Sequence, residues 1–306
     1  MKNRLVYLSL VLTALFWGAN FNLGSWVVRT LDPLSAAAWR FLLAAAVMSL
    51  YVSWREKVDW AALRRHAVPL AVMAAVGVFG FNVTFFYGLQ STSAVNGALI
   101  MTLNPTLTVV LTALVMGDAI SGRQVLGLAL SLAGVVVVVT GGSWTELARH
   151  LHFGSGDALI LLGNLCWALY SVIGKRWIRG LTPAQTTAGT MVLGAAMMLA
   201  AALSANGGAL QAPTVQAGWA LAAMALFGTV LAYLWWNNGV RRIGPARTAV
   251  FFDLVPVSAM LIAITLGEPV SLGQWLGAAL VISGVMFSSG ALDREPRPAR
   301  QGCQAA

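Results

Sequence analysis

The sequence consists of long apolar blocks separated by short polar segments, and this pattern limits the fold more than any other feature. A helix needs roughly 20 apolar residues to cross the hydrocarbon core of a membrane, about twice the number in a strand of a membrane barrel. The blocks have the length of helices. Only 9% of the 306 residues are charged, whereas a soluble domain has about 25%. We therefore predict an all-α integral membrane protein with ten spans, near residues 5–28, 34–54, 68–88, 94–116, 122–141, 156–177, 183–204, 217–239, 245–266 and 271–290.

The basic residues are distributed unevenly between the two sides of the predicted membrane. Of the 19 Lys and Arg, all except Arg29, Arg40 and Arg149 fall in segments on the same side as the N-terminus. Positively charged segments resist translocation, so this asymmetry sets the orientation. Both termini are therefore predicted to be cytoplasmic. The formal charge of +9 reflects this topology, and we expect contact with membrane lipid and none with nucleic acid.

The second half of the sequence repeats the first at an offset of about 150 residues. The ordered matches are Trp17 with Trp167, Pro33 with Pro183, Phe79-Gly80 with Phe227-Gly228, and Pro105 with Pro256. Each half contains five predicted spans, an odd number, so the halves should enter the membrane from opposite sides. Many secondary transporters build alternating access on such inverted repeats, with the substrate site at the midplane. Some channels share this architecture.

This repeat divides the chain into predicted parts. The first five-helix repeat is expected at 1–142 and the second at 156–292. Residues 143–155 form a predicted external linker, and the charged, proline-rich tail 293–306 is predicted to be a disordered cytoplasmic segment.

Four motifs lie in order along the chain, and the last of them occurs in both halves. They are Phe16-Trp17-Gly18-Ala19-Asn20, the stretch from Pro33 to Arg40-Phe41, Asn104-Pro105, and a Gly-acid-x-x-Ser-x-x-Gln-x-x-Gly pattern at 117–127 and 267–277. With them the chain resembles the drug/metabolite transporter superfamily, specifically its ten-helix EamA-type branch. The resemblance implies export of amino acids and related metabolites, aromatic ones among them, across the inner membrane of bacteria. Because the first span has no Asp or Glu, it differs from the small multidrug-resistance branch, which uses an acidic residue there.

Two charged residues, Arg40 and Asp253, lie well inside predicted spans. Charge inside a membrane is costly and suggests function by default. In the repeat they correspond to Thr190 and Thr102, so the scaffold does not require either charge in both halves. Asp253 could hold a substrate ammonium group or a coupling proton, or it could neutralise Arg247. Arg40 could bind a substrate carboxylate, or its long side chain could snorkel to the interface.

Pro105 and Pro256 stand at equivalent positions in the fourth and ninth predicted spans. A proline inside a helix removes one hydrogen bond and clashes with the carbonyl four residues before it, here that of Met101 or Phe252. Such kinks are tolerated where they face protein or a wet cavity. Both prolines are therefore predicted to kink their helices, either at a midplane site or for packing.

Amide and aromatic side chains share helix faces in several spans and predict a cavity for an amphiphilic solute, aromatic ones included. The spans expected to line it are the first, third, fourth, sixth, eighth and ninth. Interhelical hydrogen bonding is the alternative role for each amide, and the repeat-matched Trp17 and Trp167 also suit a structural role. The candidate residues are Trp17, Asn20, Asn82, Phe86, Thr102, Asn164, Trp167, Tyr233, Trp236, Asn237 and Asp253.

Glycines recur along one face of the fifth and tenth predicted spans, as the pairs Gly127/Gly134 and Gly277/Gly284. Small residues let helix backbones approach closely. We expect them to pack the two halves together, and a homodimer formed through these helices is the alternative.

No catalytic or metal-binding constellation accompanies these features. His66, His150 and His152 all lie outside the spans, and no motif for nucleotide binding or metal ligation is present. We therefore predict no cofactor, no metal and no enzymatic activity. The expected function is secondary export of small organic solutes, most notably amino acids, by alternating access. A broad-specificity drug/metabolite efflux carrier and a channel-like facilitator are the alternatives.

Overall fold

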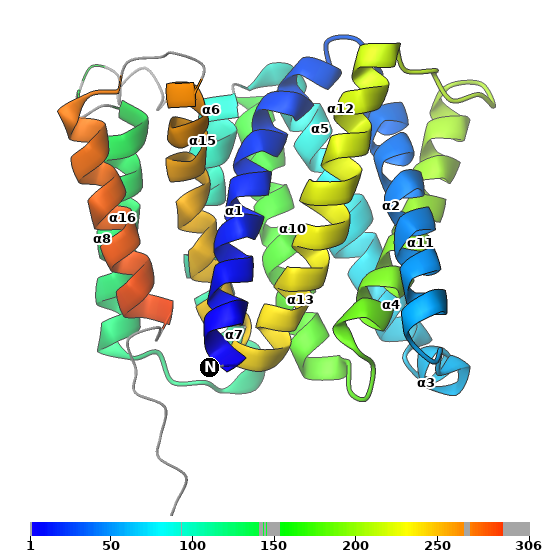
Figure 1. The fold of residues 1–306 in the computed structure, drawn as a ribbon, viewed down its shortest axis with the longest axis horizontal. Coiled ribbons are helices and arrows are strands. Elements are labelled where there is room, and N and C mark those ends of the chain that lie inside the picture. The colour runs from blue at the N-terminus through cyan, green and yellow to red at the C-terminus, as the bar shows by residue number, and fades with distance from the viewer. Residues whose placement is uncertain are drawn as a thin grey trace, which may run out of the picture.

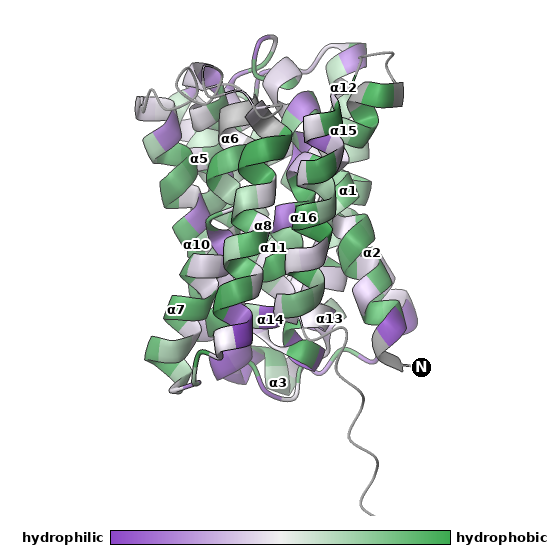
Figure 2. Cartoon of the chain, turned by 90° about the vertical axis from the view of Figure 1, so that its left-hand side faces the viewer, coloured by the Kyte–Doolittle hydropathy of each residue, from purple (hydrophilic) through white to green (hydrophobic). Residues whose placement is uncertain are grey.

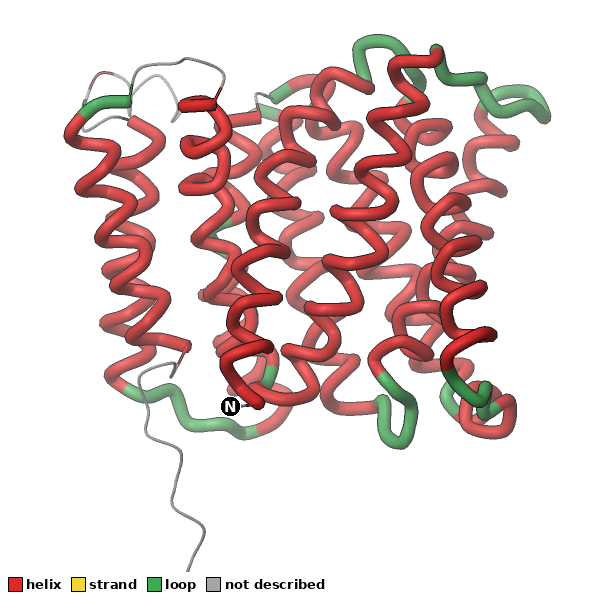
Figure 3. Tube along the Cα trace, viewed as in Figure 1, coloured by secondary structure: helices red, strands yellow, loops and turns green. Residues whose placement is uncertain are grey.

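Helices make up nearly all of the described part of the chain (Figure 3). The structure is a computed structural model that describes residues 2–92, 94–140, 154–265 and 270–289, together with Ser143 and Thr145. Within these residues it contains no strand. The first half contains α1 (Lys2–Val27), α2 (Pro33–Arg55), α3 (Trp60–Arg65), α4 (Ala67–Met73), η1 (Ala74–Gly80), α5 (Phe81–Ser91), α6 (Ala94–Met101), α7 (Asn104–Met116) and α8 (Gly122–Thr140). The second half contains α10 (Ser155–Trp177), α11 (Pro183–Ala205), α12 (Val215–Ala225), η2 (Leu226–Leu231), α13 (Ala232–Ile243), α14 (Pro245–Ala249), η3 (Val250–Asp253), α15 (Leu254–Thr265) and α16 (Leu272–Ser289).

Most of these helices are long and apolar enough to cross a membrane. Within the described residues nine stretches meet that condition, and Gly122–Val138 in α8 forms a shorter apolar helix. Hydrophobic residues cover the length of the bundle and hydrophilic ones gather toward its two ends (Figure 2). Large apolar side chains such as Leu114 and Trp219 are about three-quarters exposed, at 77% and 75%, as expected where the surrounding solvent is lipid. The predicted all-α membrane fold is confirmed.

Helices at equivalent positions of the two halves pack against each other in opposite directions. α2 and α11 form one edge of the bundle, and α8 and α16 form the opposite edge (Figure 1). Asn206 at the end of α11 donates to Asp32 before α2, at 3.1 Å. At the other end of the pair, Thr182 before α11 donates to Glu56 after α2, at 2.6 Å. These two contacts show that α2 and α11 are antiparallel.

α8 and α16 approach each other along the predicted glycines. A Cβ atom placed on Gly134 would lie 2.6 Å from the backbone nitrogen of Val281 and 2.7 Å from the carbonyl oxygen of Gly277. One placed on Gly127 would lie 2.8 Å from the carbonyl oxygen of Gly284. The helices therefore touch backbone to backbone, which any larger side chain would prevent.

The fourth and ninth spans are interrupted just before their prolines. In the fourth, α6 ends at Met101, and the N–H groups of Thr102 and Leu103 bond three residues back, to Leu99 and Ile100, each at 3.1 Å. α7 then starts with Pro105 in its first turn. In the ninth span, the 3-10 turn η3 separates α14 from α15, whose third residue is Pro256. Both sites at which we predicted kinks are breaks between two helical segments.

The third and eighth spans each contain a wide helical turn that sequence reasoning did not anticipate. η1 and η2 are π-helical, and they hold the matched pairs Phe79-Gly80 and Phe227-Gly228. π-helical turns are rare and are frequently found at functional sites. All four interruptions thus fall in spans that were expected to line a central cavity.

Some predictions fall on residues outside the described ones. These are most of the linker 143–155, with His150 and His152, the tail 293–306, and Gly267-Glu268 of the second repeated motif.

Candidate functional site

A small cavity lies in the middle of the bundle, between the two halves. Seven spans contribute to its wall, all those expected plus the second. The space that the centre of a water molecule can occupy is about 20 Å³, close to the minimum that holds one water. In this conformation, a larger ligand therefore requires side chains or helices to move apart. The lining residues are Trp17, Asn20, Phe21, Arg40, Phe81, Phe85, Met101, Trp167, Tyr233 and Phe252.

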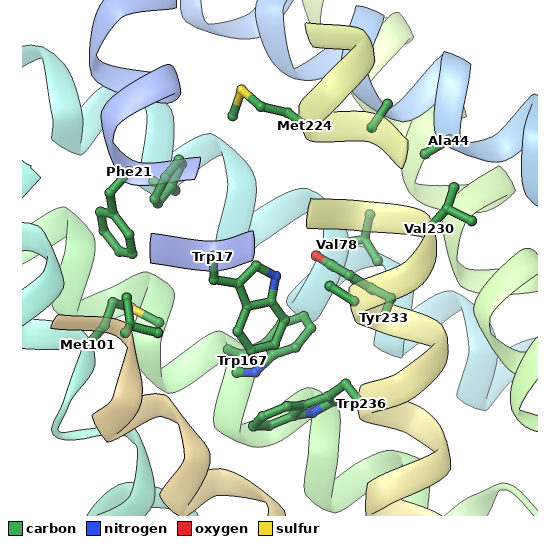
Figure 4. Close-up of a cluster of buried hydrophobic side chains, with 14 of the residues drawn as sticks. Trp17, Phe21, Ala44, Val78, Met101, Trp167, Met224, Val230, Tyr233 and Trp236 are labelled. Carbon is green, nitrogen blue, oxygen red and sulfur yellow. The ribbon is translucent and has the colours of Figure 1, made fainter. Parts of the chain in front are cut away.

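Aromatic rings form most of the cavity wall. Figure 4 shows Trp17, Trp167 and Tyr233 within the buried cluster to which they belong. Trp17 stacks on Phe252 with ring centroids 4.6 Å apart and an interplanar angle of 19°. Trp167 meets Trp17 edge-on at 5.4 Å and Tyr233 at 4.7 Å. Behind them, Trp236 packs against Trp17 at 5.1 Å. Offset and edge-to-face contacts of this kind are favourable beyond the area that they bury.

The indole N–H groups of this cluster differ in how they are satisfied. Trp17 donates to the carbonyl oxygen of Gly228 at 3.0 Å, and Trp236 donates to the hydroxyl of Ser171 at 2.9 Å. The N–H of Trp167 is buried and has no hydrogen-bond partner. A buried donor without an acceptor is uncommon and calls for an explanation, such as a ligand.

Arg40 is buried at the cavity, with only 3% of its surface exposed. Its Nε donates to the hydroxyl of Thr229 at 2.7 Å, Nη1 to the side-chain oxygen of Asn82 at 3.4 Å, and Nη2 to the carbonyl oxygen of Gly228 at 3.3 Å. All three acceptors are neutral, and no carboxylate that the structure describes pairs with the guanidinium. Arg40 therefore does not snorkel to the interface. Its positive charge is held inside the bundle without a counter-charge, which is energetically costly.

The acceptors of Arg40 lie in or close to the two wide turns. Gly228 and Thr229 belong to η2, and Asn82 is the second residue of α5, which begins after η1 ends at Gly80. Thr229 also donates to the carbonyl of Met224, at 3.0 Å, so its single hydroxyl serves both the helix backbone and the guanidinium. Glycine is needed at 228, because a Cβ atom there would overlap the amide of Asn20.

Asn82, Phe86 and Trp236 stand one layer behind the cavity wall. Asn82 donates to the backbone of Val78 at 2.8 Å and to the hydroxyl of Tyr233 at 3.3 Å. Phe86 is fully buried and packs edge-on against Phe85 with centroids 5.4 Å apart. These side chains support the lining residues and do not themselves face the space.

Asn164 and Thr102 lie at the break in the fourth span. Asn104 donates to the side-chain oxygen of Asn164 at 2.6 Å, and Asn164 donates to the carbonyl of Ile100 at 2.8 Å. Thr102 donates to the carbonyl of Leu99 at 2.6 Å. These amides tie α10 to the interrupted helix, which is the interhelical role that we considered as the alternative.

Asn237 lies toward the end of the bundle where the chain begins. It donates to the hydroxyls of Tyr170 and Thr187, at 2.8 and 2.9 Å. It also lines a hollow of about 240 Å³ that contains Lys175 and Arg241. This hollow is distinct from the central cavity.

Asp253 is buried but turns away from the central cavity. Ser131 on α8 donates a hydrogen bond to its Oδ2, whereas its Oδ1 is buried without a partner. Ser131 is thus the side-chain partner of this carboxyl group among the described residues. The neighbouring residue Phe252 is the one that faces the cavity.

Five of the predicted residues therefore line the cavity, and the sequence missed five others. Those predicted are Trp17, Asn20, Arg40, Trp167 and Tyr233. Those missed are Phe21, Phe81, Phe85, Met101 and Phe252. A usable signal existed for some of them, since Phe21 is one helical turn from Trp17 and Phe85 is one turn from Asn82. Within the described residues, no cluster of three or more His, Cys, Asp or Glu could hold a metal.

Comparison with known proteins identifies the architecture. The model of the EamA-like transporter family matches the chain twice, at residues 4–140 and 154–290. The chain belongs to this family. EamA-like relatives include the uncharacterized transporter YyaM of Bacillus subtilis, which is 43% identical over 293 residues, covering 95% of this chain and 96% of YyaM. The uncharacterized inner membrane transporter YedA of Escherichia coli K12 is 26% identical, covering 89% of this chain and 87% of YedA.

The EamA-like fold is also found in a solved crystal structure of a protein. That structure superposes with a TM-score of 0.75 over 95% of this chain and 99% of its own, at 22% sequence identity. This likeness supports the fold alone. The family match, the composition and the pattern of apolar helices together show that this chain is a multi-pass membrane protein of a transporter family.

Proposed function

We propose that this protein is a secondary transporter that exports small organic solutes, chiefly amino acids, including aromatic ones, and related metabolites. One observation carries the proposal: an aromatic cavity between the two halves contains a buried guanidinium for which the described residues offer no carboxylate partner. A substrate that carries both a carboxylate and an apolar side chain matches this wall.

The charge of Arg40 favours an anionic group on the substrate. A carboxylate within reach would supply the missing counter-charge, and hydrogen bonds to charged groups contribute about 1.5–3 kcal/mol. The free N–H of Trp167 offers a second donor. Aromatic rings such as Trp17 and Phe252 would stack on a ring or pack against an aliphatic side chain. A hydrophobic cation would meet repulsion in the same place.

Transport is proposed to occur by alternating access between inverted repeats. The antiparallel pairing of α2 with α11 supports an inverted relation of the halves. The cavity has room for roughly one water, so substrate passage requires the halves to rock apart. Interrupted helices such as α6–α7 and the wide turns provide sites where such motion can be absorbed. We infer a location in the bacterial inner membrane with both termini in the cytoplasm, from the distribution of basic residues.

Counterflow in liposomes tests the proposal. Purified full-length protein is reconstituted into vesicles preloaded with unlabelled phenylalanine, and uptake of external labelled phenylalanine is followed. We expect transient, saturable uptake that depends on the internal amino acid. Absence of counterflow for phenylalanine, tryptophan, leucine and glutamate would refute the proposal, and linear flux without exchange would identify a channel-like facilitator.

Variants of Arg40 then test the carboxylate contact. Arg40→Gln should weaken transport of phenylalanine about tenfold to a hundredfold, because a charged hydrogen bond is lost. Arg40→Lys keeps the charge and should recover part of the activity. Arg55→Gln, at the exposed end of α2, is the matched control and should behave as wild type. Equal transport by wild type and both Arg40 variants would remove the guanidinium from substrate binding.

A broad-specificity efflux carrier for drugs and metabolites is the second candidate. The predominance of rings over polar groups in the cavity wall favours it, since aromatic surfaces accept many apolar shapes. Competition distinguishes the two: a carrier of carboxylates is inhibited by phenylpropionate and not by phenethylamine. The reverse order would favour the drug carrier.

A further inference from the structure

A second buried ionisable group, Asp253, lies outside the central cavity. A substrate bound in that cavity therefore does not explain why this group is buried. Asp253 is 1% exposed and is held in η3 between α14 and α15. One of its oxygens accepts from Ser131, and the other has no partner. A carboxylate with a purely structural role in a membrane protein would be expected to have its oxygens satisfied by fixed donors or a cation.

Ser131 is the hydrogen-bond partner that the described residues give to Asp253. Helices α1, α7, α8, α14, α15 and α16 pack against η3. The charged and titratable residues in the sequence of these helices are Lys2, Arg4, Tyr7, Arg123 and Arg247.

Ser131 allows the carboxyl group to be satisfied in two protonation states. Its hydroxyl lies near two acceptors, the Oδ2 of Asp253 and, at 3.2 Å, the carbonyl of Leu128 on its own helix. When Asp253 is ionised, the serine hydroxyl donates to it. When Asp253 has taken up a proton, its O–H can donate to the serine oxygen while the serine O–H turns to Leu128. One rotating hydroxyl therefore serves both states.

A hollow at one end of the bundle is lined in part by α8, the helix that carries Ser131. This hollow of about 390 Å³ opens between α7, α8, α14 and α16, and its lining includes Thr112, Gln124 and Arg247. The hydroxyl oxygen of Thr112 is buried without a partner, which offers a hydrogen bond to water. Ser131 lies seven residues beyond Gln124 on α8, or about 10 Å at 1.5 Å per residue.

The pair is mechanically linked to the cavity. Phe252, the residue before Asp253, stacks on Trp17 at 4.6 Å and lines the cavity. Both residues belong to the 3-10 turn η3, and such turns within a span often mark a hinge. A ligand that displaces Phe252 must therefore also move the carboxyl group of Asp253 relative to Ser131.

We propose that Asp253 and Ser131 form a proton-exchange site, separate from the central cavity, that couples proton movement to transport. In this step an O–H bond forms on the Asp253 carboxylate as one O–H bond of a hydronium ion breaks, which leaves a water molecule, and release of the proton is the reverse. The ligand is a proton because the described neighbours offer only the carboxylate and one hydroxyl. Ca²⁺ and Mg²⁺, in contrast, take about six oxygen ligands or more. The inference rests on the proposed transport function.

The proton site itself is tested without any substrate. Purified protein in lipid is titrated between about pH 5 and about pH 9, a range that covers buried carboxyls, and infrared difference spectra are recorded. We expect a carbonyl stretch of a protonated carboxyl group that titrates reversibly, is lost in Asp253→Asn and shifts in Ser131→Ala. Asp157→Asn, which alters another buried aspartate, should leave the band unchanged. A band that persists in Asp253→Asn, or no titrating band at all, overturns the site.

Coupling is tested in the liposomes used for counterflow, with labelled phenylalanine as the probe. A gradient of one pH unit can drive up to about tenfold accumulation if one proton moves per substrate. Wild type and Asp157→Asn should accumulate phenylalanine, and Ser131→Ala should accumulate less. Asp253→Asn, which imitates the protonated form, should lose accumulation and keep counterflow.

Other outcomes would contradict the coupling. These are accumulation retained in Asp253→Asn, counterflow lost in a variant that melts like wild type, or accumulation driven by sodium instead of protons. If wild type shows no phenylalanine counterflow, the proposed function fails, and the infrared titration still decides whether Asp253 exchanges a proton.

Discussion

Thr229→Val tests whether the buried charge of Arg40 depends on neutral acceptors. Valine has nearly the shape of threonine, so packing is preserved while the acceptor of Arg40 Nε, now at 2.7 Å, is removed. The guanidinium is buried, with 3% of its surface exposed, so bulk solvent does not reach it to replace the lost partner. Leaving such a charged donor unsatisfied costs about 1.5–3 kcal/mol. At roughly 2 °C per kcal/mol for a large chain, the melting temperature should fall by about 3–6 °C.

The assay is thermal unfolding in detergent, followed by circular dichroism, with two control variants. Thr186→Val removes a hydroxyl that bonds only within its own helix, to Thr182 at 3.0 Å, so the loss should stay below about 1 kcal/mol. Thr229→Ser keeps the hydroxyl and should lose less than about 1 kcal/mol, the value of one buried methylene. If Thr229→Val and Thr186→Val melt together, Arg40 does not need this acceptor and the account of its site is wrong.

Further substitutions test packing and the ties between helices. Gly134→Ala should destabilise the protein by about 1–3 kcal/mol, because its new methyl group overlaps backbone atoms of α16, whereas Gly218→Ala meets open space and should stabilise by about 0.5–1 kcal/mol. Trp236→Phe should cost about 1–3 kcal/mol through a lost hydrogen bond and a void, while Trp219→Phe at the lipid surface should change stability by less than about 0.5 kcal/mol. Asn104→Leu should cost about 1–2 kcal/mol by removing the hydrogen bonds from α7 to α10. Thermal melting measures the change in stability of each variant. Equal changes for Gly134→Ala and Gly218→Ala, or for Trp236→Phe and Trp219→Phe, would contradict the packing argument.

The sequence predicted the spans well because lipid imposes a simple requirement on them. An apolar run must be long enough to cross, so the end of α2 at Arg55 and the start of α11 at Pro183 lie within one residue of the expected boundaries. The breaks before Pro105 and Pro256 were also foreseeable, since proline cannot continue a hydrogen-bonded helix. The amide and aromatic side chains on shared helix faces, together with the paired prolines, predicted a central cavity.

Side-chain directions within the spans could not be obtained in the same way. Asp253 and Phe252 are adjacent in sequence and point in different directions, Asp253 toward α8 and Phe252 toward the cavity, since successive residues of a helix are rotated by about 100°. The 3-10 turn changes this angle, so which of the two faces the cavity does not follow from α-helical spacing. The π-helical turns have the same effect on Asn82 and Tyr233. No residue pattern in the sequence marked these turns, so the acceptors of Arg40 were not recognised.

The paired wide turns also carry information about how the chain arose. A π-helical turn holds one more residue than an α-helical one, and one residue corresponds to about 100° of rotation along a helix. η1 and η2 stand at matched motifs in both halves, so the simplest history places the extra residue in an ancestral half before the gene doubled. Deleting one residue from either turn should therefore swing the following segment around its axis, turning Asn82 or Tyr233 away from its partners while leaving the hydrophobic length of the span almost unchanged.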